Sequence, residues 1–369
     1  MTEKAKIITG IVLTLSAMLP TEADAQTTQR LSATKANDYA LVYTLPTTRL
    51  AVTIEAEITV KRPGEFYKYA KKYLNIDHPI TQESRSAILK SAVIATSGTP
   101  NTDERYAVQF KSGTAPFMLL SADNIPLAIN TEKTLPSATP TLPEAVPAPP
   151  TPLQTAAARQ VVSEEMMQSQ STAKRAELAA SALFAIRQTR NDLITGQAEQ
   201  TPPDGKSLQL MLDNLEAQEQ ALMAMFVGTT AVSTDVATFN ITPDDNISQM
   251  VVARISAVDG IVDANDLSGA PVYLNLSVTS RGEMPLNEKG EELPFPKNGL
   301  AYCIPGTANV KVSFDNHSFA EADVEMAQFG VVYGLAPNSF TDRKAPIFVI
   351  FDPATGAIAT QGAAEPASK

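Results

Sequence analysis

The chain has 369 residues, of which 44% are hydrophobic and 19% are charged, and its formal net charge at pH 7 is −11. This length and balance indicate a globular protein with room for two or three domains. The negative charge argues against nucleic acid and against an anionic membrane surface as partners. The only cysteine, Cys303, excludes an internal disulfide, and its apolar neighbours predict a thiol buried in a strand.

The first 25 residues have the order of a secretory signal peptide. Lys4 and Lys6 precede an apolar run at residues 7–19, and Ala25 ends a motif of small residues of the kind that signal peptidase reads. We therefore predict cleavage between Ala25 and Gln26. We expect an exported protein in the periplasm, at the outer membrane or outside the cell. The apolar run is shorter than a bilayer requires and no later run is longer, so we expect no membrane span after signal removal.

Residues 26–135 predict a β-rich part with one short helix. Between Leu50 and Val60, apolar residues alternate with mostly polar ones, which is the pattern of a strand with one buried face. Helical spacing of apolar residues at 66–74 predicts the helix. Shorter strands are expected at 91–96, 105–111 and 116–120.

A proline-rich segment at 136–155 follows. Proline lacks a backbone N–H and has a fixed φ, so we expect an extended linker that joins neither a sheet nor a helix.

Residues 156–227 predict an antiparallel helical hairpin. The first helix is expected to end at Gly196, and the second to begin after Asp204, because glycine and aspartate are typical of helix C-terminal and N-terminal caps. A turn near residue 200 would bring opposite charges together across the hairpin, namely Arg187 and Arg190 with Asp213 and Glu216.

Residues 228–361 predict a second β-rich part. Matching the apolar faces of neighbouring strands predicts a hairpin with a three-residue loop at 316–318, which places Lys311 opposite Asp323. The strands are expected at 248–258, 270–280, 299–304, 308–315, 318–328, 329–335 and 345–351.

The end of the chain predicts one more hairpin and a tail. In Asp352-Pro353-Ala354-Thr355-Gly356, proline presets φ and glycine permits positive φ, which is typical of a tight turn. Residues 362–369 are expected to form a loose tail.

Two groups of oxygen-bearing side chains are the candidates for a metal site. One lies in the loop at 259–269, whose spacing departs from an EF-hand loop, and the other follows one face of the strand at 321–325. An acidic surface loop and a solvated strand face explain the same patterns more simply, and we favour those interpretations. The candidate residues are Asp263, Asn265, Asp266, Glu321, Asp323 and Glu325.

No catalytic residue and no cofactor is indicated by the sequence. The two histidines, His78 and His317, have no second ligand at a spacing typical of zinc sites. Ser171 and Lys174 repeat an S-x-x-K pattern, but the other elements of the enzymes that use this pattern are missing or in the wrong order.

Four stretches together resemble a known family: RPGEFYKYAKKYLNI at 62–76, PPDGKSLQLMLDNLEAQEQALMAMFVG at 202–228, AEADVEMAQFGVVYGLAP at 320–337 and VIFDPATGAI at 349–358. The family is an uncharacterised one of exported proteins from Gram-negative gut anaerobes, a domain of unknown function. The resemblance implies a cell-envelope or secreted setting. It implies no activity, ligand or catalytic residue.

The predicted fold class is α+β, with antiparallel, sandwich-like β-rich parts on either side of the helical hairpin. The sequence leaves open whether the two β-rich parts form separate sandwiches or share one sheet. We expect a non-catalytic binding or scaffolding protein of the cell envelope, whose hairpin binds another envelope protein or a second copy of the chain. The alternative is a hydrolase that acts on glycan or peptidoglycan through paired carboxylates.

Overall fold

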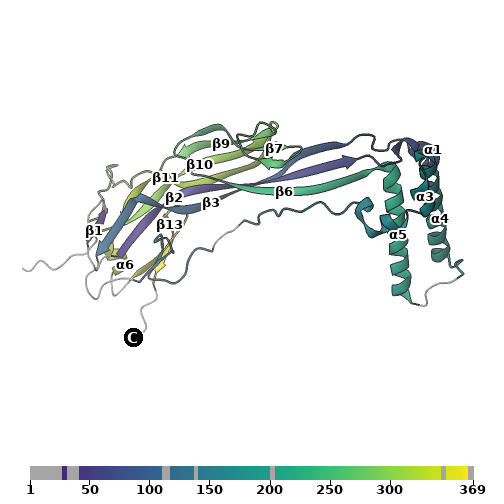
Figure 1. The fold of residues 1–369 in the computed structure, drawn as a ribbon. Helices are drawn as coiled ribbons and strands as arrows, with labels where there is room; N and C mark the ends of the chain where they lie inside the picture. Colours follow the sequence, from purple (N-terminus) through teal and green to yellow (C-terminus); the bar gives the residue numbers. More distant parts are fainter. Residues whose placement is uncertain are drawn as a thin grey trace, which may run out of the picture.

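The computed structural model describes residues 27–30, 41–109, 117–136, 140–199, 204–341 and 346–364. These residues form three antiparallel sheets, A, B and C, and a group of helices at one end of an elongated molecule (Figure 1). The predicted α+β class, with a helical hairpin between β-rich parts, is confirmed. The predicted signal peptide and its cleavage site lie outside the described residues.

Sheet A is built on one long hairpin. Its strands, in spatial order, are β1 (Thr27–Arg30), β3 (Ser84–Gln109), β2 (Leu41–Arg62) and β6 (Thr229–Ile241). β2 pairs with β3 on one edge and with β6 on the other. Since β6 follows the helices in the chain, the N-terminal and C-terminal β-rich parts share this sheet.

The apolar face predicted for β2 is buried over the half of the strand that faces sheet C, but Thr53 and Glu55 on the face expected to be exposed are buried as well. Leu50, Val52, Ile54 and Ala56 are completely buried. From Thr59 to Arg62, by contrast, no side chain of β2 is buried. The strand therefore continues beyond the core that its apolar face helps to form.

The strand predicted at 91–96 and residues 105–109 of the strand predicted at 105–111 are parts of the single strand β3; residues 110 and 111 lie outside the described residues. Pro46 of β2 lies opposite Pro100 of β3, next to an interruption of the ladder. A residue without an N–H is tolerated where the ladder is broken, so the two prolines do not end the strands.

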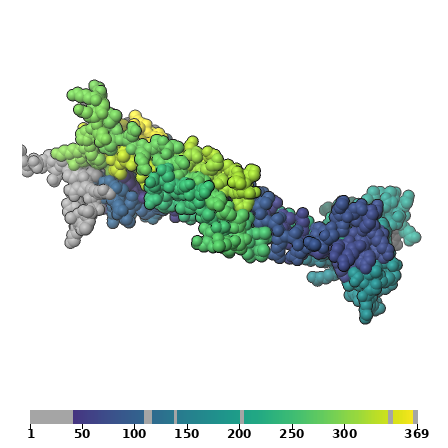
Figure 2. Space-filling view, turned by 90° about the horizontal axis from the view of Figure 1, so that it is seen from above, coloured from purple at the N-terminus to yellow at the C-terminus, as the bar shows by residue number. Residues whose placement is uncertain are grey.

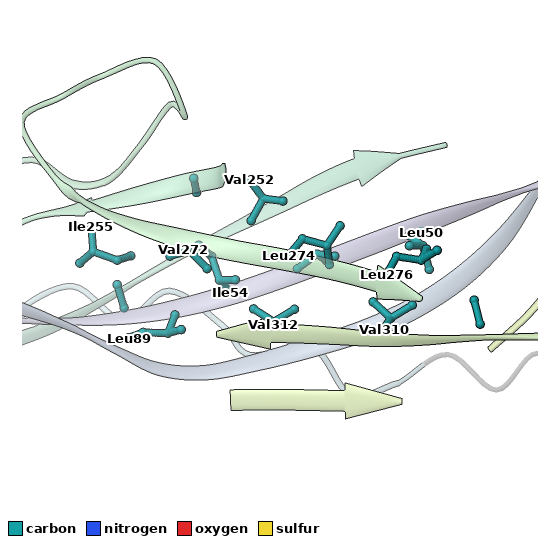
Figure 3. Close-up of a cluster of buried hydrophobic side chains, with 14 of the residues drawn as sticks. Leu50, Ile54, Leu89, Val252, Ile255, Val272, Leu274, Leu276, Val310 and Val312 are labelled. Atoms are coloured by element: carbon teal, nitrogen blue, oxygen red, sulfur yellow. The ribbon is translucent and has the colours of Figure 1, made fainter. Parts of the chain in front are cut away.

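Sheet C packs on sheet A to form a sandwich. Its strands, in spatial order, are β11 (His317–Leu335), β10 (Leu300–Phe314), β9 (Ala270–Ser280), β7 (Ile247–Ser256) and β8 (Gly260–Val262). Leu50 and Ile54 from sheet A meet Val272, Leu274 and Val310 from sheet C in one buried cluster (Figure 3). Burial of each such side chain is worth about 1.5–3 kcal/mol.

Sheet B closes the end of the sandwich away from the helices. It contains β13 (Ile358–Ala363), β12 (Ile347–Phe351), β5 (Pro126–Ile129) and β4 (Met118–Leu120), with the short helix α6 (Pro337–Thr341) beside it. The predicted turn at 352–356 joins β12 to β13, and Gly356 has the positive φ of 73° that was expected of it. The Asp352 carboxylate accepts hydrogen bonds from the N–H of Ala354 and the hydroxyl of Thr355, both at 2.9 Å.

The predicted register of the β10–β11 hairpin is wrong. The connection is a two-residue turn, in which Asp315 and Asn316 have φ values of 47° and 62° and Phe314 lies opposite His317. Positive φ at both central residues fits the right-handed twist of a hairpin, which favours this turn over a three-residue loop. A register shift after Val312 then places Lys311 opposite Glu321 instead of Asp323.

The helices form a head at the other end of sheet A. They are η1 (Tyr67–Tyr69), α1 (Ala70–Leu74), η2 (Pro152–Gln154), α2 (Ala156–Gln160), α3 (Glu164–Gln168), α4 (Thr172–Thr195) and α5 (Gly205–Val227). The two caps predicted for the hairpin are confirmed. Gly196 ends α4 with a φ of 72°, and the Asp204 carboxylate accepts a hydrogen bond from the N–H of Ser207 at the start of α5.

The ion pairs predicted across the hairpin are wrong in their acidic partner. Arg187 and Arg190 both contact the Glu219 carboxylate, each at 2.7 Å, instead of Asp213 and Glu216. Side chains on a helix lean toward its N-terminus. In an antiparallel pair of helices, an arginine on α4 and a glutamate on α5 therefore lean in opposite directions along the hairpin. The glutamate that meets the arginine is then several residues later in α5 than the residue whose Cα lies level with the arginine Cα.

The proline-rich segment runs back along β6 from sheet B to the head (Figure 1). Residues 140–151 are extended, as predicted, but two parts of the prediction are wrong: Pro152–Gln154 form the short helix η2, and the segment joins the sheet at one residue. The N–H of Val146 donates to Thr234 O at 3.1 Å, and the N–H of Thr234 donates to Val146 O at 2.8 Å. Val146 retains the N–H that Pro143 and Pro147 lack, so it can donate to the sheet.

Candidate functional site

The predicted acidic residues do not come together. The loop with Asp263 and Asp266 follows β8 at one edge of sheet C, whereas Glu321 and Glu325 lie on β11 at the other edge. Four strand spacings separate the two edges, a distance of about 20 Å. The paired carboxylates of glycosidases lie within about 10 Å of each other, so the two groups cannot act as one pair.

Within the 263–268 loop, the carboxylates hold the backbone in tight turns. Asp263 Oδ1 accepts hydrogen bonds from the N–H and the Nδ2 of Asn265, both at 2.9 Å. Asp266 Oδ1 accepts from the N–H of Ser268 at 2.9 Å, and this hydrogen bond holds the pKa of Asp266 below its usual value. Each carboxylate thus already has a partner in the loop.

The acidic row on β11 is an exposed strand face. Glu321 forms an ion pair with Lys311 at 3.3 Å, and Asp323 accepts a hydrogen bond from Asn309 Nδ2 at 2.9 Å. Both partners lie on the neighbouring strand β10, as cross-strand pairs do. In the part of the chain that the structure describes, no three His, Cys, Asp or Glu side chains are placed to hold a metal ion together.

Cys303 is buried in β10, as its sequence neighbours predicted. Burial raises the pKa of its thiol to about 12. A thiol with this pKa stays protonated at neutral pH, so Cys303 lacks the thiolate that nucleophilic or redox chemistry requires.

The S-x-x-K pattern is part of a helix cap. Ser171 precedes α4, and its hydroxyl accepts a hydrogen bond from the N–H of Lys174 at 3.4 Å. The Lys174 ammonium forms an ion pair with Glu177 at 3.1 Å. His78 is exposed in the loop after α1, and the His317 ring contacts Asp315 O in the β10–β11 turn. His78 thus lies in a connection, whereas His317, predicted in the hairpin loop, is the first residue of β11; among the described residues neither belongs to a cluster that could hold a metal ion.

A buried polar network joins the three sheets, and the sequence did not reveal it. Thr48 of β2 donates its hydroxyl to Ala354 O and accepts from the N–H of Ala327 in β11, both at 2.9 Å. Gln328 bonds to both backbone groups of Thr48 and donates to Pro243 O at 2.9 Å. The partners are up to 306 residues apart in the sequence, so no local pattern could have shown the network.

Inside the head, the connection between β2 and β3 is held to α5 through the backbone. The N–H of Phe66 donates to Met225 O at 2.7 Å, and the N–H of Ile80 donates to Val227 O at 2.9 Å. Gly64 lies so close to the Met225 carbonyl that a Cβ would overlap with it. The Phe66 and Phe226 rings pack at 5.5 Å in the core of the head.

A narrow three-stranded arm connects the head to the sandwich (Figure 2). It consists of residues Thr59–Arg62, Ser84–Ser86 and Thr229–Val232, which pair with one another beyond the cover of sheet C. The arm positions the head away from the sandwich at a fixed place in the sheet. The described residues contain no helix that is both long enough and apolar enough to span a membrane.

The head carries several large apolar side chains in contact with solvent. Phe184 on α4 and Leu210 on α5 are 51% and 65% exposed. Helix faces of this kind commonly bind another protein. These exposed side chains of the head are the candidate interface residues: Met167, Phe184, Ile194, Leu210 and Met211.

A hollow of about 670 Å³ lies where sheet C ends and the arm begins. Its lining comes from β3, β7, β9 and the β10–β11 turn, and includes Tyr273 and Asn275. None of the six predicted acidic or amide candidates lines it. Residues from four separate segments form the hollow, so the sequence alone did not reveal it.

Residues 39–359 match the sequence model of the family described as Domain of unknown function (DUF4831). No curated protein and no solved structure matches the chain.

Proposed function

Because the chain belongs to the DUF4831 family, whose description states no activity, we propose a function from the structure: a non-catalytic binding or scaffolding protein of the cell envelope. The head is the part that binds another protein or a second copy of the chain. The sandwich and the arm hold the head in a fixed position.

One observation carries this proposal: a helical head is built onto the end of a continuous sheet. β2 runs directly into the head, and β6 leaves α5 after Gly228; both strands also form the sandwich. An exposed apolar surface at the end of such a support can be presented to a partner with little loss of conformational freedom. Separately, the signal-like first 25 residues support placement in the cell envelope.

A photo-crosslinking experiment tests the role of the head. A photoreactive amino acid replaces Phe184 or Leu210 in the full-length protein produced in its native cells. We expect a crosslinked species of defined mass, either a dimer or a complex with one protein that also captures this chain in the reciprocal experiment. Leu267 serves as a matched control, because it is 81% exposed but lies in the sandwich.

Three outcomes would contradict the proposal. They are crosslinking that is equal at Leu267, the absence of any defined product at the head positions, and fractionation that finds the protein in the cytoplasm. N-terminal sequencing of the fractionated protein should begin at Gln26. The hydrolase alternative has no support from the geometry, since the two groups of carboxylates lie at opposite edges of sheet C.

A further inference from the structure

The hollow between sheet C and the arm has the size and lining of a ligand site. Its volume of about 670 Å³ falls within the range of about 300–1,000 Å³ that is typical of small-molecule pockets. Three strands of sheet C, the β10–β11 turn and the root of the arm at Ala87 and Ile88 line it. Its walls are therefore paired strands, with an irregularity of β7 at Gln249, and a tight turn.

Side-chain amides and hydroxyls provide most of its polar groups. Gln249, Asn275 and Asn316 contribute amides, and Ser313 and Tyr273 contribute hydroxyls. An amide carries both donors and acceptors, and a hydroxyl can serve as either. Such a lining suits a ligand that itself carries many hydroxyl groups.

Asn275 is held in a defined orientation by a strained neighbour. Gln249 has a φ of 50°, which is uncommon for a residue other than glycine. Its N–H donates to Asn275 Oδ1 at 2.9 Å. The Asn275 oxygen is thus occupied, and among the described residues its Nδ2 amino group has no hydrogen-bond partner. That amino group is available as a donor to a ligand in the hollow.

The charge of the lining decides between ligand classes. Asp315 is its only charged residue, and no lysine or arginine of the described residues lines it. A phosphate, sulfate or uronic acid would meet a carboxylate and no cation, which disfavours anionic ligands. The rings of Tyr273 and Phe314 provide flat apolar surface of the kind that packs against the C–H face of a sugar.

We propose that this hollow binds a neutral carbohydrate, with the amides and hydroxyls as hydrogen-bond partners and the aromatic rings as the packing surface. The site is separate from the head and goes beyond the scaffolding function proposed above. Loss of carbohydrate binding would leave crosslinking through the head unchanged, so the two proposals fail independently.

A glycan array tests the proposal with the full chain. The array carries neutral oligosaccharides of glucose, mannose, galactose, xylose and N-acetylglucosamine, together with acidic glycans. We expect binding to at least one neutral class and none to the acidic glycans. Titration calorimetry with the best neutral oligosaccharide then gives the affinity of the protein and its variants.

The variants separate binding from folding. Asn275→Ala and Tyr273→Ala should each weaken binding about tenfold, as expected for loss of a hydrogen bond or an aromatic contact in a binding site. Gln249→Gly removes a lining side chain and relieves the positive φ, so it should weaken binding while the melting temperature stays equal or rises. Asn309→Ala is the matched control, because this amide lies on β10 outside the hollow and should leave the affinity unchanged.

Three results would overturn the proposal. The first is an array without a neutral ligand, and the second is binding to acidic glycans alone. The third is an affinity that Gln249→Gly and Asn275→Ala leave unchanged in folded protein.

Discussion

In the sandwich, sheet A is covered by sheet C, whereas in the arm the same strands carry the head without a covering sheet. Leu50 to Ala56 of β2 bury alternate side chains completely, but Thr59 to Arg62 bury none. The core of the head is also of a different kind, since alanines such as Ala176, Ala179 and Ala221 occupy much of it. Small side chains let helices approach closely but bury less apolar area.

One continuous sheet thus joins a two-sheet sandwich core to a helical head with a core rich in alanine. We expect the sandwich to set the global stability of the protein and the head to open first by local unfolding. The substitutions below test this expected difference in stability between the sandwich and the head.

The largest effect is expected from a cavity in the sandwich. Ile54→Ala should lower the free energy of unfolding by about 2–5 kcal/mol, because Ile54 is completely buried between sheets A and C. Urea unfolding measures the loss. The control Ile88→Ala changes a residue that is 55% exposed and should cost no more than about 0.5 kcal/mol. Equal losses of unfolding free energy in the two variants would contradict the expectation that the sandwich core sets the global stability.

A smaller effect is expected at the junction of arm and head. Gly64→Ala should cost about 1–3 kcal/mol, because the new Cβ would overlap with the backbone carbonyls of Ala224 and Met225. Hydrogen exchange should show loss of protection in the head and little change in the sandwich. Gly205→Ala is the matched control, since open space surrounds this glycine at the start of α5 and no loss is expected. Loss of protection spread evenly over both parts would contradict the contrast.

A third test compares one carboxylate from each part. Hydrogen bonds from Lys90 at 2.9 Å and Ser91 at 2.7 Å hold the pKa of Glu55 below its ordinary value of 4.5. The folded protein therefore favours the ionised carboxylate. Its contribution is fully present above pH 4.5 and is lost as the pH falls through the lower pKa of the folded protein.

Glu55→Gln should therefore cost about 0.5–1.5 kcal/mol at neutral pH, and the difference from the unaltered protein should shrink below pH 4.5. In the head, Glu219→Gln removes the shared partner of Arg187 and Arg190, and should cost about 0–1 kcal/mol. Denaturant unfolding across a pH series measures both. If the loss of unfolding free energy caused by Glu55→Gln increased at acid pH, the lowered pKa of Glu55 in the folded protein would be contradicted.

The smallest effect is expected from the acidic face of β11. Together, Glu321→Gln, Asp323→Asn and Glu325→Gln should change the free energy of unfolding by no more than about 0.5 kcal/mol. The face is exposed, and its contacts with Lys311 and Asn309 are surface pairs. Millimolar calcium should leave the melting temperature of both proteins unchanged. Calcium stabilisation that the triple variant loses would instead identify this face as a cation site.

Local patterns predicted the elements whose causes are local. The alternation in β2, the caps at Gly196 and Asp204, and the turn at 352–356 each depend on residues close together in the chain. The β10–β11 register was wrong because a two-residue turn and a register shift together match the same faces as the predicted three-residue loop. A pattern of faces cannot distinguish these solutions.

Features with distant causes could not be predicted. The pairing of β2 with β6 brings Leu50 beside Ile241, and no sequence pattern in either strand predicts this pairing. The Thr48–Gln328 network and the hollow around Asn275 likewise combine segments that are far apart in the sequence. The acidic candidates were visible in the sequence because they are neighbours along the chain. In the structure, hydrogen bonds within a loop and pairs between neighbouring strands account for their contacts.

The insertion of the helices between β3 and β6 also sets the order in which the protein can fold. The β2–β3 hairpin is local and can form as soon as Gln109 has been synthesised. Its other edge, from Leu50 to Arg62, then stays unpaired until the whole head has been made and Thr229 to Ile241 arrive. An open strand edge with one apolar face is a template for aggregation. A chain that ends before β6 should therefore aggregate through β2, even though every residue of that strand is intact.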